Sequence, residues 1–312
     1  MRFCVMAALL SSALNQTGLR VYGVRMAMID HFNEFAARFG GGMVRGSSPL
    51  VSVVRLSGAI GAAGLGRKGL NMTTLEAPLR RAFGKRGVTA VALVINSPGG
   101  SPVQSELIAG RIRQLSEEKD IPVYAFAEDV AASGGYWLAC CADEIYASPM
   151  SIVGSIGVIA ATFGFPDLLE KIGVERRVYA QGDNKSMLDP FKPENPDDVA
   201  RVLELQKDIH GQFKAYVKSR RGEKLKGADK TLFNGDVWTG ERALKKGLID
   251  GLGEMRSVLR EKLGDKVRFM PVQRQAGWLQ RRLGGADAFG GNFARDLMSA
   301  AEERALWARF GL

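Results

Sequence analysis

Short apolar runs of strand length alternate with helical segments along most of this chain, and this alternation constrains the fold more than any other feature. Residues 50–56, 88–95 and 121–126 are rich in small or branched apolar residues, as in buried strands. Residues 73–83 and 102–118 lie between these runs and have helical patterns. Strands that are separated by helices pair in parallel through right-handed crossovers. The sequence therefore predicts an α/β fold with parallel strands.

The two helices and the later segments carry further expectations. The helix at 73–83 opens with Thr-Thr-Leu-Glu, a capping-box pattern. The helix at 102–118 is expected to have one apolar face, formed by Val103, Leu107, Ile108, Ile112 and Leu115. Residues 131–148 predict a turn, a short helix and a strand. The remaining predictions are strands at 154–160, 174–180 and 267–272, and helices at 197–221, within 239–253 and at 253–263.

The two ends of the chain differ from this alternating region. Residues 1–46 form an N-terminal extension, interpreted either as a signal-like segment or as the product of an early start codon. Its apolar run is too short to span a bilayer, which needs ~20 residues, and no other stretch predicts a transmembrane helix. Residues 273–312 are interpreted as a C-terminal helical appendage. The predicted main domain is therefore 47–272.

Charge and composition exclude several functions. The net charge of +10 is spread along the chain without interleaved aromatic residues, which favours solvated helix faces over a nucleic-acid partner. The chain has two histidines and three cysteines, at none of the spacings of a zinc site, so neither a metal nor another cofactor is expected. The cysteines are Cys4 and the adjacent pair Cys140 and Cys141, which we expect to be small core residues.

Three glycine-rich turns are the candidates for chemistry. They are Asn-Ser-Pro-Gly-Gly-Ser at 96–101, Ala-Ala-Ser-Gly-Gly-Tyr at 131–136 and Gly-Ser-Ile-Gly at 154–157. Such turns leave backbone N–H groups free for phosphate or a developing oxyanion, although each alone is also consistent with a structural turn. In the second turn, small neighbours leave the hydroxyl of Ser133 accessible beside the N–H of Gly134. Ser133 could equally be a plain helix N-cap.

A serine nucleophile needs a base, and the two histidines are poor candidates. His31 lies in the N-terminal extension, and His210 lies in a long charged helix. A lysine, whose ordinary pKa is ~10.4, can serve when it is enclosed enough to become neutral. Lys185 fits this description because it follows a predicted strand and precedes several apolar residues. A solvated loop lysine is the alternative.

Together these segments resemble the signal peptide peptidase A family of serine peptidases, over about residues 50–270. The resemblance rests on Ile-Asn-Ser-Pro-Gly-Gly at 95–100, Ala-Ala-Ser-Gly-Gly-Tyr-Trp at 131–137, Gly-Ser-Ile-Gly-Val at 154–158 and the loop lysine. The segment 234–253 also has the character of the family. The resemblance implies the fold shared by Clp protease and crotonase.

The resemblance also implies roles for individual residues. Ser133 is the expected nucleophile and Lys185 the expected general base of a Ser–Lys dyad, with Ser155 orienting the lysine. Gly134 and one of the pair Gly99 and Gly100 are the expected oxyanion-hole donors.

The implied activity is that of a serine endopeptidase acting on signal-peptide remnants, or on other membrane-derived or unfolded peptides. With one copy of the motifs, the chain is expected to assemble into a homo-oligomer with sites at subunit junctions. The expected location is the bacterial cell envelope, at the surface of the inner membrane, with the cytoplasm as the alternative. Two other functions stay open: a crotonase-like enzyme acting on acyl-coenzyme A, and a non-catalytic oligomeric scaffold.

Overall fold

The structure is a computed structural model that describes residues 48–61, 69–272 and 304–311. The predicted N-terminal extension and most of the predicted appendage lie outside these residues, and the domain limits therefore stay predictions. Residues 304–308 are helical, in agreement with the terminal helix expected there.

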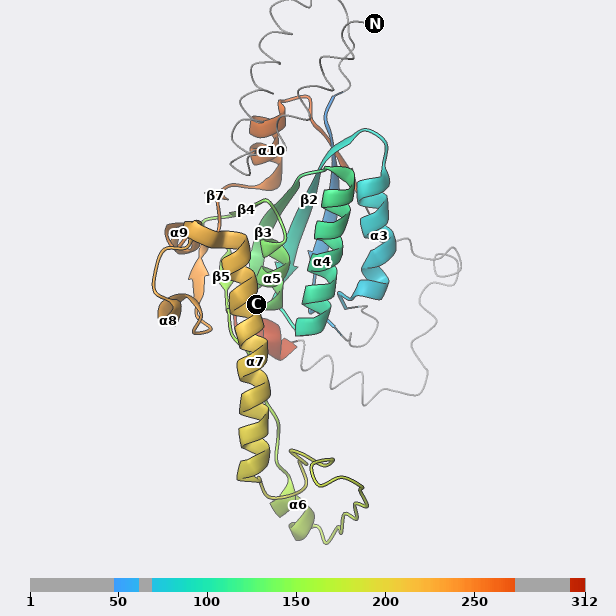
Figure 1. The fold of residues 1–312 in the computed structure, drawn as a ribbon, viewed down its shortest axis with the longest axis vertical. Coiled ribbons are helices and arrows are strands. Elements are labelled where there is room, and N and C mark those ends of the chain that lie inside the picture. The colour runs from blue at the N-terminus through green and yellow to red at the C-terminus, as the bar shows by residue number, and fades with distance from the viewer. Residues whose placement is uncertain (1–47, 62–68, 273–303, 312) are drawn as a thin grey trace, which may run out of the picture. The chain divides into compact units, whose positions relative to one another are not determined.

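A mostly parallel sheet forms the centre of the described chain (Figure 1). Its main path has the strand order β6-β5-β3-β2-β1-β8, and every pair along it is parallel except β5 with β6. Two further strands, β4 and β7, extend from β3. The predicted α/β class is confirmed. The strands are β1 (Leu50–Ser57), β2 (Val88–Ser97), β3 (Val123–Ala132), β4 (Glu144–Ala147), β5 (Ile152–Gly154), β6 (Val237–Thr239), β7 (Gly251–Leu252) and β8 (Arg268–Pro271).

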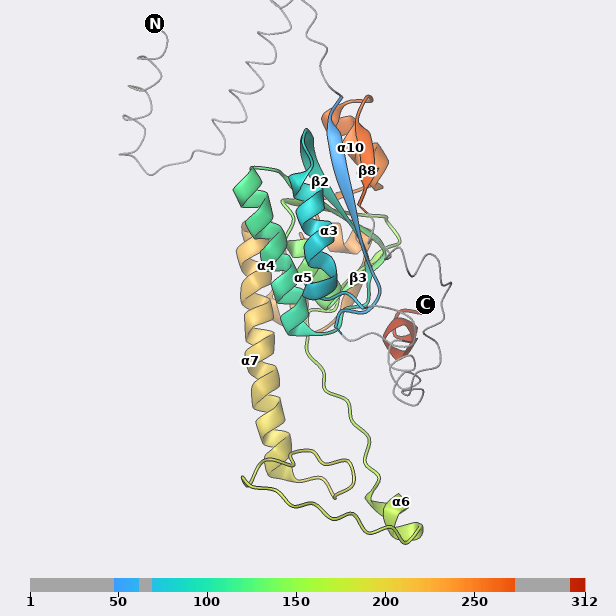
Figure 2. The same ribbon diagram turned by 90° about the vertical axis from the view of Figure 1, so that its right-hand side faces the viewer.

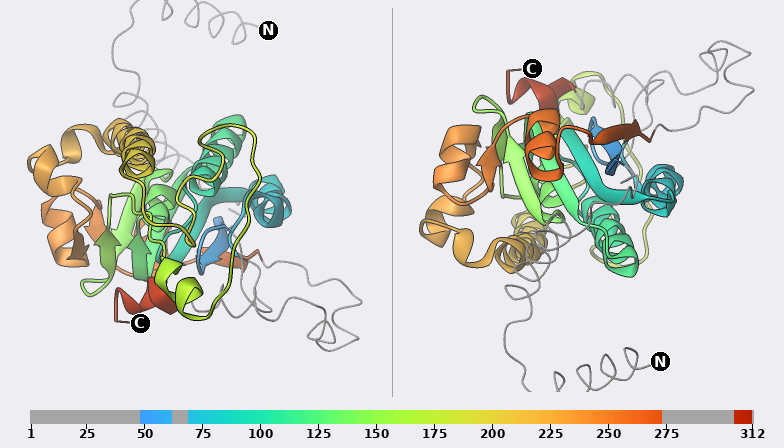
Figure 3. Two further views of the ribbon diagram at one scale, coloured as in Figure 1. Left: turned by 90° about the horizontal axis from the view of Figure 1, so that it is seen from below. Right: turned by 90° about the horizontal axis from the view of Figure 1, so that it is seen from above.

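The helices lie on both faces of this sheet (Figure 3). One face is covered by α3, α4, α5 and the last turns of α7, and the other by α10. The helices are α3 (Met72–Gly84), α4 (Pro102–Lys119), α5 (Gly134–Cys140), α6 (Pro166–Lys171), α7 (Pro196–Arg221), α8 (Asp229–Leu232), α9 (Gly240–Lys245) and α10 (Met255–Leu263), with a 3-10 turn, η1, at Gly222–Lys224.

Two hydrophobic cores follow from the alternation of side chains along the strands. In β2, Val91, Leu93 and Ile95 belong to the larger core under α3, α4 and α5. Ala90 and Ala92 point the other way and belong to the smaller core under α10. Both faces of the central strands are therefore buried, which explains their nearly continuous apolar sequences.

Two expectations for the first helices are wrong in detail. α3 is not capped by its Thr-Thr-Leu-Glu sequence; the side chain of Asn71 caps it by accepting a hydrogen bond from the N–H of Thr74. In α4, Ile108, Ile112 and Leu115 are buried as predicted, whereas Val103 and Leu107 are 59% and 48% exposed. These two residues lie on the outer face of the helix, which no other described element covers.

Two predicted strands are absent from the described structure. The strand predicted at 154–160 ends at Gly154, because Ser155 has a φ of 53°, which is incompatible with an extended strand. The segment 174–180 is exposed and is not in a strand. The apolar residues of this segment give it the sequence pattern of a strand, but no neighbouring strand forms backbone hydrogen bonds with it.

Residues 157–209, which we call the arm, extend away from the sheet (Figures 1 and 2). They include α6 and the first half of α7, and both views place α6 beyond the sheet, towards the far end of α7. Within α7 the buried residues lie in the second half only: Phe213, Val217 and Arg221. The arm exposes several large apolar side chains, including Phe163, Ile172, Tyr179, Leu203 and Leu205.

Candidate active site

Ser133 lies at the junction between β3 and α5 in an unusual backbone conformation. Its φ is 52° and its ψ is −122°, a region that residues other than glycine rarely adopt. Its N–H donates to the carbonyl of Gly154 at 2.8 Å, and its carbonyl accepts from the N–H groups of Tyr136 and Trp137. The hydroxyl does not cap α5 and makes no hydrogen bond with any described residue. Ser133 thus holds the N-cap position without serving as a side-chain cap.

The glycine turn at 99–100 packs directly against this serine. A Cβ atom on Gly99 would lie 2.7 Å from the Cβ of Ser133 and 2.9 Å from the nitrogen of Gly134. A Cβ atom on Gly100 would lie 2.1 Å from the carbonyl oxygen of Ile60. Both glycines also have positive φ values, of 103° and 141°. Only glycine fits at these two positions, which explains the Pro-Gly-Gly sequence.

The backbone donors around Ser133 are not equally available. The N–H of Gly99 donates to the hydroxyl oxygen of Ser97 at 3.2 Å. The N–H groups of Gly100 and Gly134 have no acceptor within the part of the chain that the structure describes. They lie close together, because a Cβ atom on Gly134 would be 3.4 Å from the nitrogen of Gly100. Two unpaired donors therefore lie beside Ser133.

Ser155 lies next to Ser133, directly after the end of the neighbouring strand β5. β3 and β5 pair with Ala132 opposite Gly154, so the next residue on each strand is one of the two serines. Ser155 is 7% exposed, its φ is 53°, and its N–H donates to the carbonyl of Asp236 at 2.7 Å. The strand pairing thus brings the third glycine-rich turn beside the second, and the role of Ser155 stays a prediction.

Lys185, by contrast, is exposed on the arm. The N–H of Leu188, close to it, donates to a carboxylate oxygen of Asp198 in the first turn of α7, at 3.2 Å. The first buried residue of α7 comes fifteen residues later: it is Phe213, whose ring stacks on Trp137 of α5 at 4.9 Å. At 1.5 Å per residue this separation is about 22 Å along the helix axis.

One chain therefore does not bring the lysine to the serine. Among the described residues, the ammonium group of Lys185 has no hydrogen-bond or ion-pair partner. The enclosed environment expected for this side chain is not found within a single chain.

The segment that carries Lys185 is held by contacts at the end of the arm. The ring of Phe165 packs between Phe163 and Phe191, at centroid distances of 6.2 and 5.9 Å. The guanidinium group of Arg176 lies 4.8 Å above the ring of Phe191 and also pairs with Asp189. The hydrogen bond from the backbone N–H of Phe191 lowers the pKa of the Asp189 carboxyl, and the guanidinium group of Arg176 lowers it further. The arm thus has a small packed cluster of its own.

The remaining candidates are accounted for by packing or lie outside the described residues. Cys140 and Cys141 are buried, and burial raises the pKa of each thiol to about 12, as suits the core residues that we expected. Cys4 and His31 lie outside the described residues. His210 is half-buried on α7, and its Nε2 atom has no hydrogen-bond partner within the described structure.

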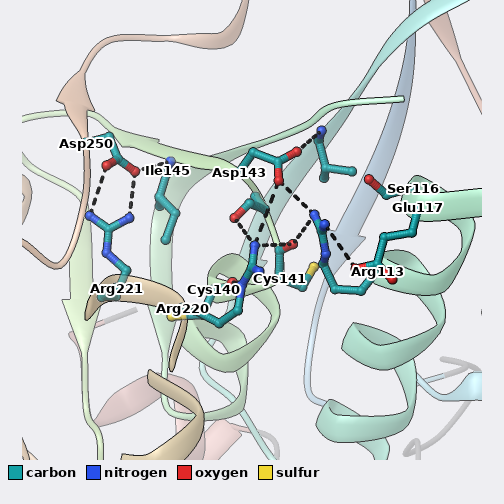
Figure 4. Close-up of polar contacts among 12 residues, drawn as sticks. Arg113, Ser116, Glu117, Cys140, Cys141, Asp143, Ile145, Arg220, Arg221 and Asp250 are labelled. Atoms are coloured by element: carbon teal, nitrogen blue, oxygen red, sulfur yellow. Dashed lines mark hydrogen bonds and ion pairs between the residues drawn. The ribbon is translucent and has the colours of Figure 1, made fainter. Parts of the chain in front are cut away.

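The sequence interpretation missed a group of arginines behind α5 (Figure 4). Arg220 and Arg221 belong to a basic stretch that we interpreted as a solvated helix face. Arg221 is instead buried against Asp250, and Arg220 donates to the carbonyls that end α5. Only the burial of the last turn of α7 distinguishes these two residues from their exposed neighbours.

The model of peptidase family S49 matches residues 116–266, which include Ser133, Gly134, Ser155 and Lys185. This region of the chain belongs to peptidase family S49. An Enterococcus faecium protein named as a signal peptide peptidase SppA is 31% identical over 193 residues, which are 62% of this chain and 56% of that relative. The chloroplastic serine protease SPPA of Arabidopsis thaliana is 35% identical over 168 residues, which are 53% of this chain and 24% of that protein.

A relative with a different name is more similar in sequence. A Brucella abortus protein named Na(+)/H(+) antiporter NhaA is 51% identical over 272 residues, which are 84% of this chain and 37% of that protein. The chain thus spans less than two thirds of each of these three relatives. Within the described residues, no helix is both long enough and apolar enough to cross a membrane.

Two solved structures of a membrane-bound stomatin-specific protease also match this chain. They share 19% and 18% sequence identity with it, at TM-scores of 0.42 and 0.45. They cover 72% and 76% of this chain, and the matches span nearly all of those proteins. The second structure contains a substrate peptide.

Proposed function

We propose that this chain is a serine endopeptidase whose nucleophile is Ser133. The observation that carries the proposal is that the hydroxyl of Ser133 makes no hydrogen bond to the end of α5 and lies beside two unpaired backbone N–H groups. These are the N–H groups of Gly100 and Gly134. A nucleophile adjacent to two convergent donors is the arrangement that acyl transfer requires. Membership of family S49 and relatives named as proteases support the same activity.

The proposed oxyanion hole consists of the N–H groups of Gly100 and Gly134. Gly99 is the weaker candidate because its N–H is already engaged by Ser97. Its role is instead to let the turn approach Ser133 closely, since any side chain there would clash with the serine. This assigns different tasks to the two adjacent glycines.

Lys185 is the proposed general base, and a second copy of the chain brings it to Ser133. The site is incomplete without such a copy, because the arm holds Lys185 away from the nucleophile of its own chain. The exposed apolar side chains of the arm supply the contact surface for this assembly. Enclosure at a subunit junction also favours the neutral amine that a lysine base needs.

The proposed reaction follows from these groups. The neutral amine of Lys185 takes the proton of the Ser133 hydroxyl, whose oxygen bonds to the peptide carbonyl carbon while the carbonyl π electrons move to oxygen. The oxyanion accepts hydrogen bonds from Gly100 and Gly134, and the ammonium group then protonates the leaving amine as the C–N bond breaks. Water, deprotonated by the same lysine, releases the acyl group from Ser133. Ser155 lies close enough to Ser133 to orient the incoming lysine.

The proposed substrates are signal-peptide remnants or other membrane-derived or unfolded peptides. The proposed location is the bacterial cell envelope at the surface of the inner membrane, with the cytoplasm as the alternative. The surface of the arm, which is apolar and also carries Lys171, Arg176 and Arg177, would suit association with a membrane surface as well as with a second copy. Antiporter activity is not proposed, because the chain spans 37% of the relative that has that name.

The test is covalent labelling with an alkyl fluorophosphonate, followed by peptide mapping. The wild-type protein should be labelled at Ser133 and should hydrolyse unfolded casein, and Ser133→Ala should lose both properties while its circular dichroism stays unchanged. A Ser57→Ala variant is the matched control, because Ser57 is an exposed serine at the end of β1, which β2 separates from β3. A wild-type protein that is not labelled at Ser133 but acts on an acyl-coenzyme A thioester would favour the crotonase-like alternative. A folded assembly with neither property would favour the scaffold.

A further inference from the structure

The carboxyl end of α5 is held by two arginines from other helices (Figure 4). Arg220 of α7 donates from Nε to the carbonyl of Cys140 at 2.9 Å and from Nη2 to that of Ala142 at 3.0 Å. The carbonyl of Cys141 accepts from Arg220 and from Arg113 of α4, both at 3.4 Å. These are the carbonyls that a helix leaves without partners at its end, so the guanidinium groups complete the hydrogen bonding of α5.

Asp143 fixes the position of these two arginines. Its carboxylate pairs with Arg113 at 2.8 Å, lies 3.9 Å from Arg220 and accepts the N–H of Val123 at 2.8 Å. Burial opposes the charge of Arg113, but the neighbouring Asp143 carboxylate raises the pKa of the guanidinium group above its usual value. Two positively charged side chains thus lie at the negative end of the helix, where positive charge is favourable.

α7 also contacts α5 through aromatic stacking one turn after the proposed nucleophile. The ring of Trp137 stacks on Phe213 at 4.9 Å and on Tyr216 at 4.8 Å. All seven residues of α5 are buried, so the packing around the helix restricts its movement. At its amino end, Ser133 holds a backbone conformation that costs on the order of 1–3 kcal/mol and persists only where surrounding contacts enforce it.

We propose that Arg220 is a positioning residue for the nucleophile. By fixing the carboxyl end of α5 to α7, it holds the strained turn at Ser133 and the adjacent N–H of Gly134 in the geometry for attack. Arg220 touches no reacting atom, and its effect passes through the seven residues of α5. This inference rests on the proposed peptidase function and names a residue that supports the same site.

The neighbouring arginine provides a matched control. Arg221 is more deeply buried than Arg220, yet it donates to the carbonyl of Gly247 and pairs with Asp250 at 2.7 Å. Asp250 in turn accepts the N–H of Ile145 at 2.8 Å. Arg221 therefore fastens the same turn of α7 to a different part of the fold, without a hydrogen bond to the end of α5.

The experiment compares Arg220→Met, Arg220→Lys and Arg221→Lys in the full chain. The readouts are the rate of fluorophosphonate labelling of Ser133, kcat and KM on an internally quenched peptide, and the melting temperature. Arg220→Met should lower the labelling rate and kcat by about tenfold or more, or roughly 1.4 kcal/mol in the barrier, with little change in KM. Arg220→Lys keeps the positive charge and can still donate a hydrogen bond to one of these carbonyls. Its labelling rate and kcat should therefore lie between those of Arg220→Met and wild type. Arg221→Lys should label at a rate within about twofold of wild type.

Three outcomes would overturn the inference. The first is a folded Arg220→Met protein that labels and turns over at the wild-type rate. The second is an equal loss in Arg221→Lys, which would mean that any loosening of α7 has the same effect. If Arg220→Met does not fold, Arg220→Lys is used for the test instead. The third outcome is that Arg220→Lys is then labelled at the wild-type rate. A wild-type protein that is never labelled at Ser133 would instead overturn the proposed peptidase function itself.

Discussion

The two halves of the proposed dyad lie in regions of opposite character. Ser133 is surrounded by buried strands and a buried helix, and its backbone is fixed by hydrogen bonds at 2.8–3.0 Å. Lys185 lies on an exposed arm whose large apolar side chains are uncovered; Phe163 is 80% exposed and Tyr179 is 92% exposed. The proposed nucleophile and the proposed oxyanion donors are thus brought together by folding, whereas the proposed base needs an additional surface.

This difference gives the two regions different tolerances to substitution. Changes around Ser133 should impair both the fold and the chemistry. Changes on the arm other than at Lys185 should leave the sheet and its helices intact and act mainly through assembly. The predictions below test this contrast, from the largest expected effect to the smallest.

The largest contrast is expected for the same substitution at two glycines with positive φ. Gly100→Ala places a Cβ atom 2.1 Å from the carbonyl of Ile60 and should displace an oxyanion donor, lowering kcat by about 10²–10³. Gly173→Ala on the arm meets no atom within 4 Å, and its φ of 68° should cost roughly 1–2 kcal/mol of stability. Peptide hydrolysis and thermal melting measure the two effects. Equal losses of kcat in the two variants would contradict the contrast.

Large aromatic side chains should show the same contrast in stability. Trp137→Ala removes a buried ring that stacks on two others, and should cost about 3–5 kcal/mol of unfolding free energy. Phe163→Ala should change the unfolding free energy by less than about 1 kcal/mol, because most of this ring is exposed.

Phe163→Ala should instead weaken self-association, which sedimentation velocity measures over a range of protein concentrations. Denaturant titration of the dissociated chain separates this effect from folding. A loss of unfolding free energy in Phe163→Ala as large as that in Trp137→Ala would show that the arm is part of the folding core.

The predicted and observed elements agree where periodicity and burial agree. The sheet strands at 50–56, 88–95 and 121–126 and the helices between them were predictable, because buried strands are continuously apolar and helices repeat every 3.6 residues. The glycine motifs also indicated the turns that meet at Ser133. The prediction of a strand at 174–180 is wrong because these apolar residues lie exposed on the arm, where no neighbouring strand pairs with them.

Other features depend on long-range contacts that local patterns do not encode. Arg220 and Arg221 differ from the lysines around them only in what the last turn of α7 packs against. The preference for Gly100 over Gly99 as a donor depends on the hydroxyl of Ser97, which already occupies one of the two N–H groups. The exposure of Lys185 depends on the direction of α7 beyond the sheet.

The buried pair of Arg221 and Asp250 should make a smaller, pH-dependent contribution. Burial raises the pKa of the Asp250 carboxyl, but the hydrogen bonds and positive charges of Arg221 and Lys224, with the N–H of Ile145, together outweigh burial and lower the pKa overall. A lowered folded-state pKa gives stability that is present above the unfolded value of about 3.9 and is lost as the pH falls through the folded-state pKa.

Melting temperatures between about pH 6 and pH 3 measure this contribution. Asp250→Asn should be less stable than wild type near neutral pH, and the difference should shrink in acid. Lys224→Gln controls for the exposed cation that also contacts Asp250. A difference between Asp250→Asn and wild type that grows as the pH falls would contradict the assigned direction.

The smallest effect is expected for the two adjacent cysteines. Burial raises the pKa of Cys140 and Cys141 to about 12, so little thiolate forms at neutral pH and native protein should resist iodoacetamide at both positions. Peptide mass spectrometry after labelling in native and denaturing buffer measures this directly. Rapid labelling of either thiol in the native state would mean that α5 opens readily.

The central claim is that Ser133 of one chain and Lys185 of another form one site. Ser133→Ala and Lys185→Ala should each be inactive alone, and co-expression in one assembly should restore hydrolysis at roughly a quarter of the junctions if subunits mix at random in a ring. Affinity tags of two kinds would isolate assemblies that contain both variants. Restored hydrolysis is the result that this account predicts. Mixed assemblies without activity would contradict it, because a dyad within one chain leaves neither variant with both groups.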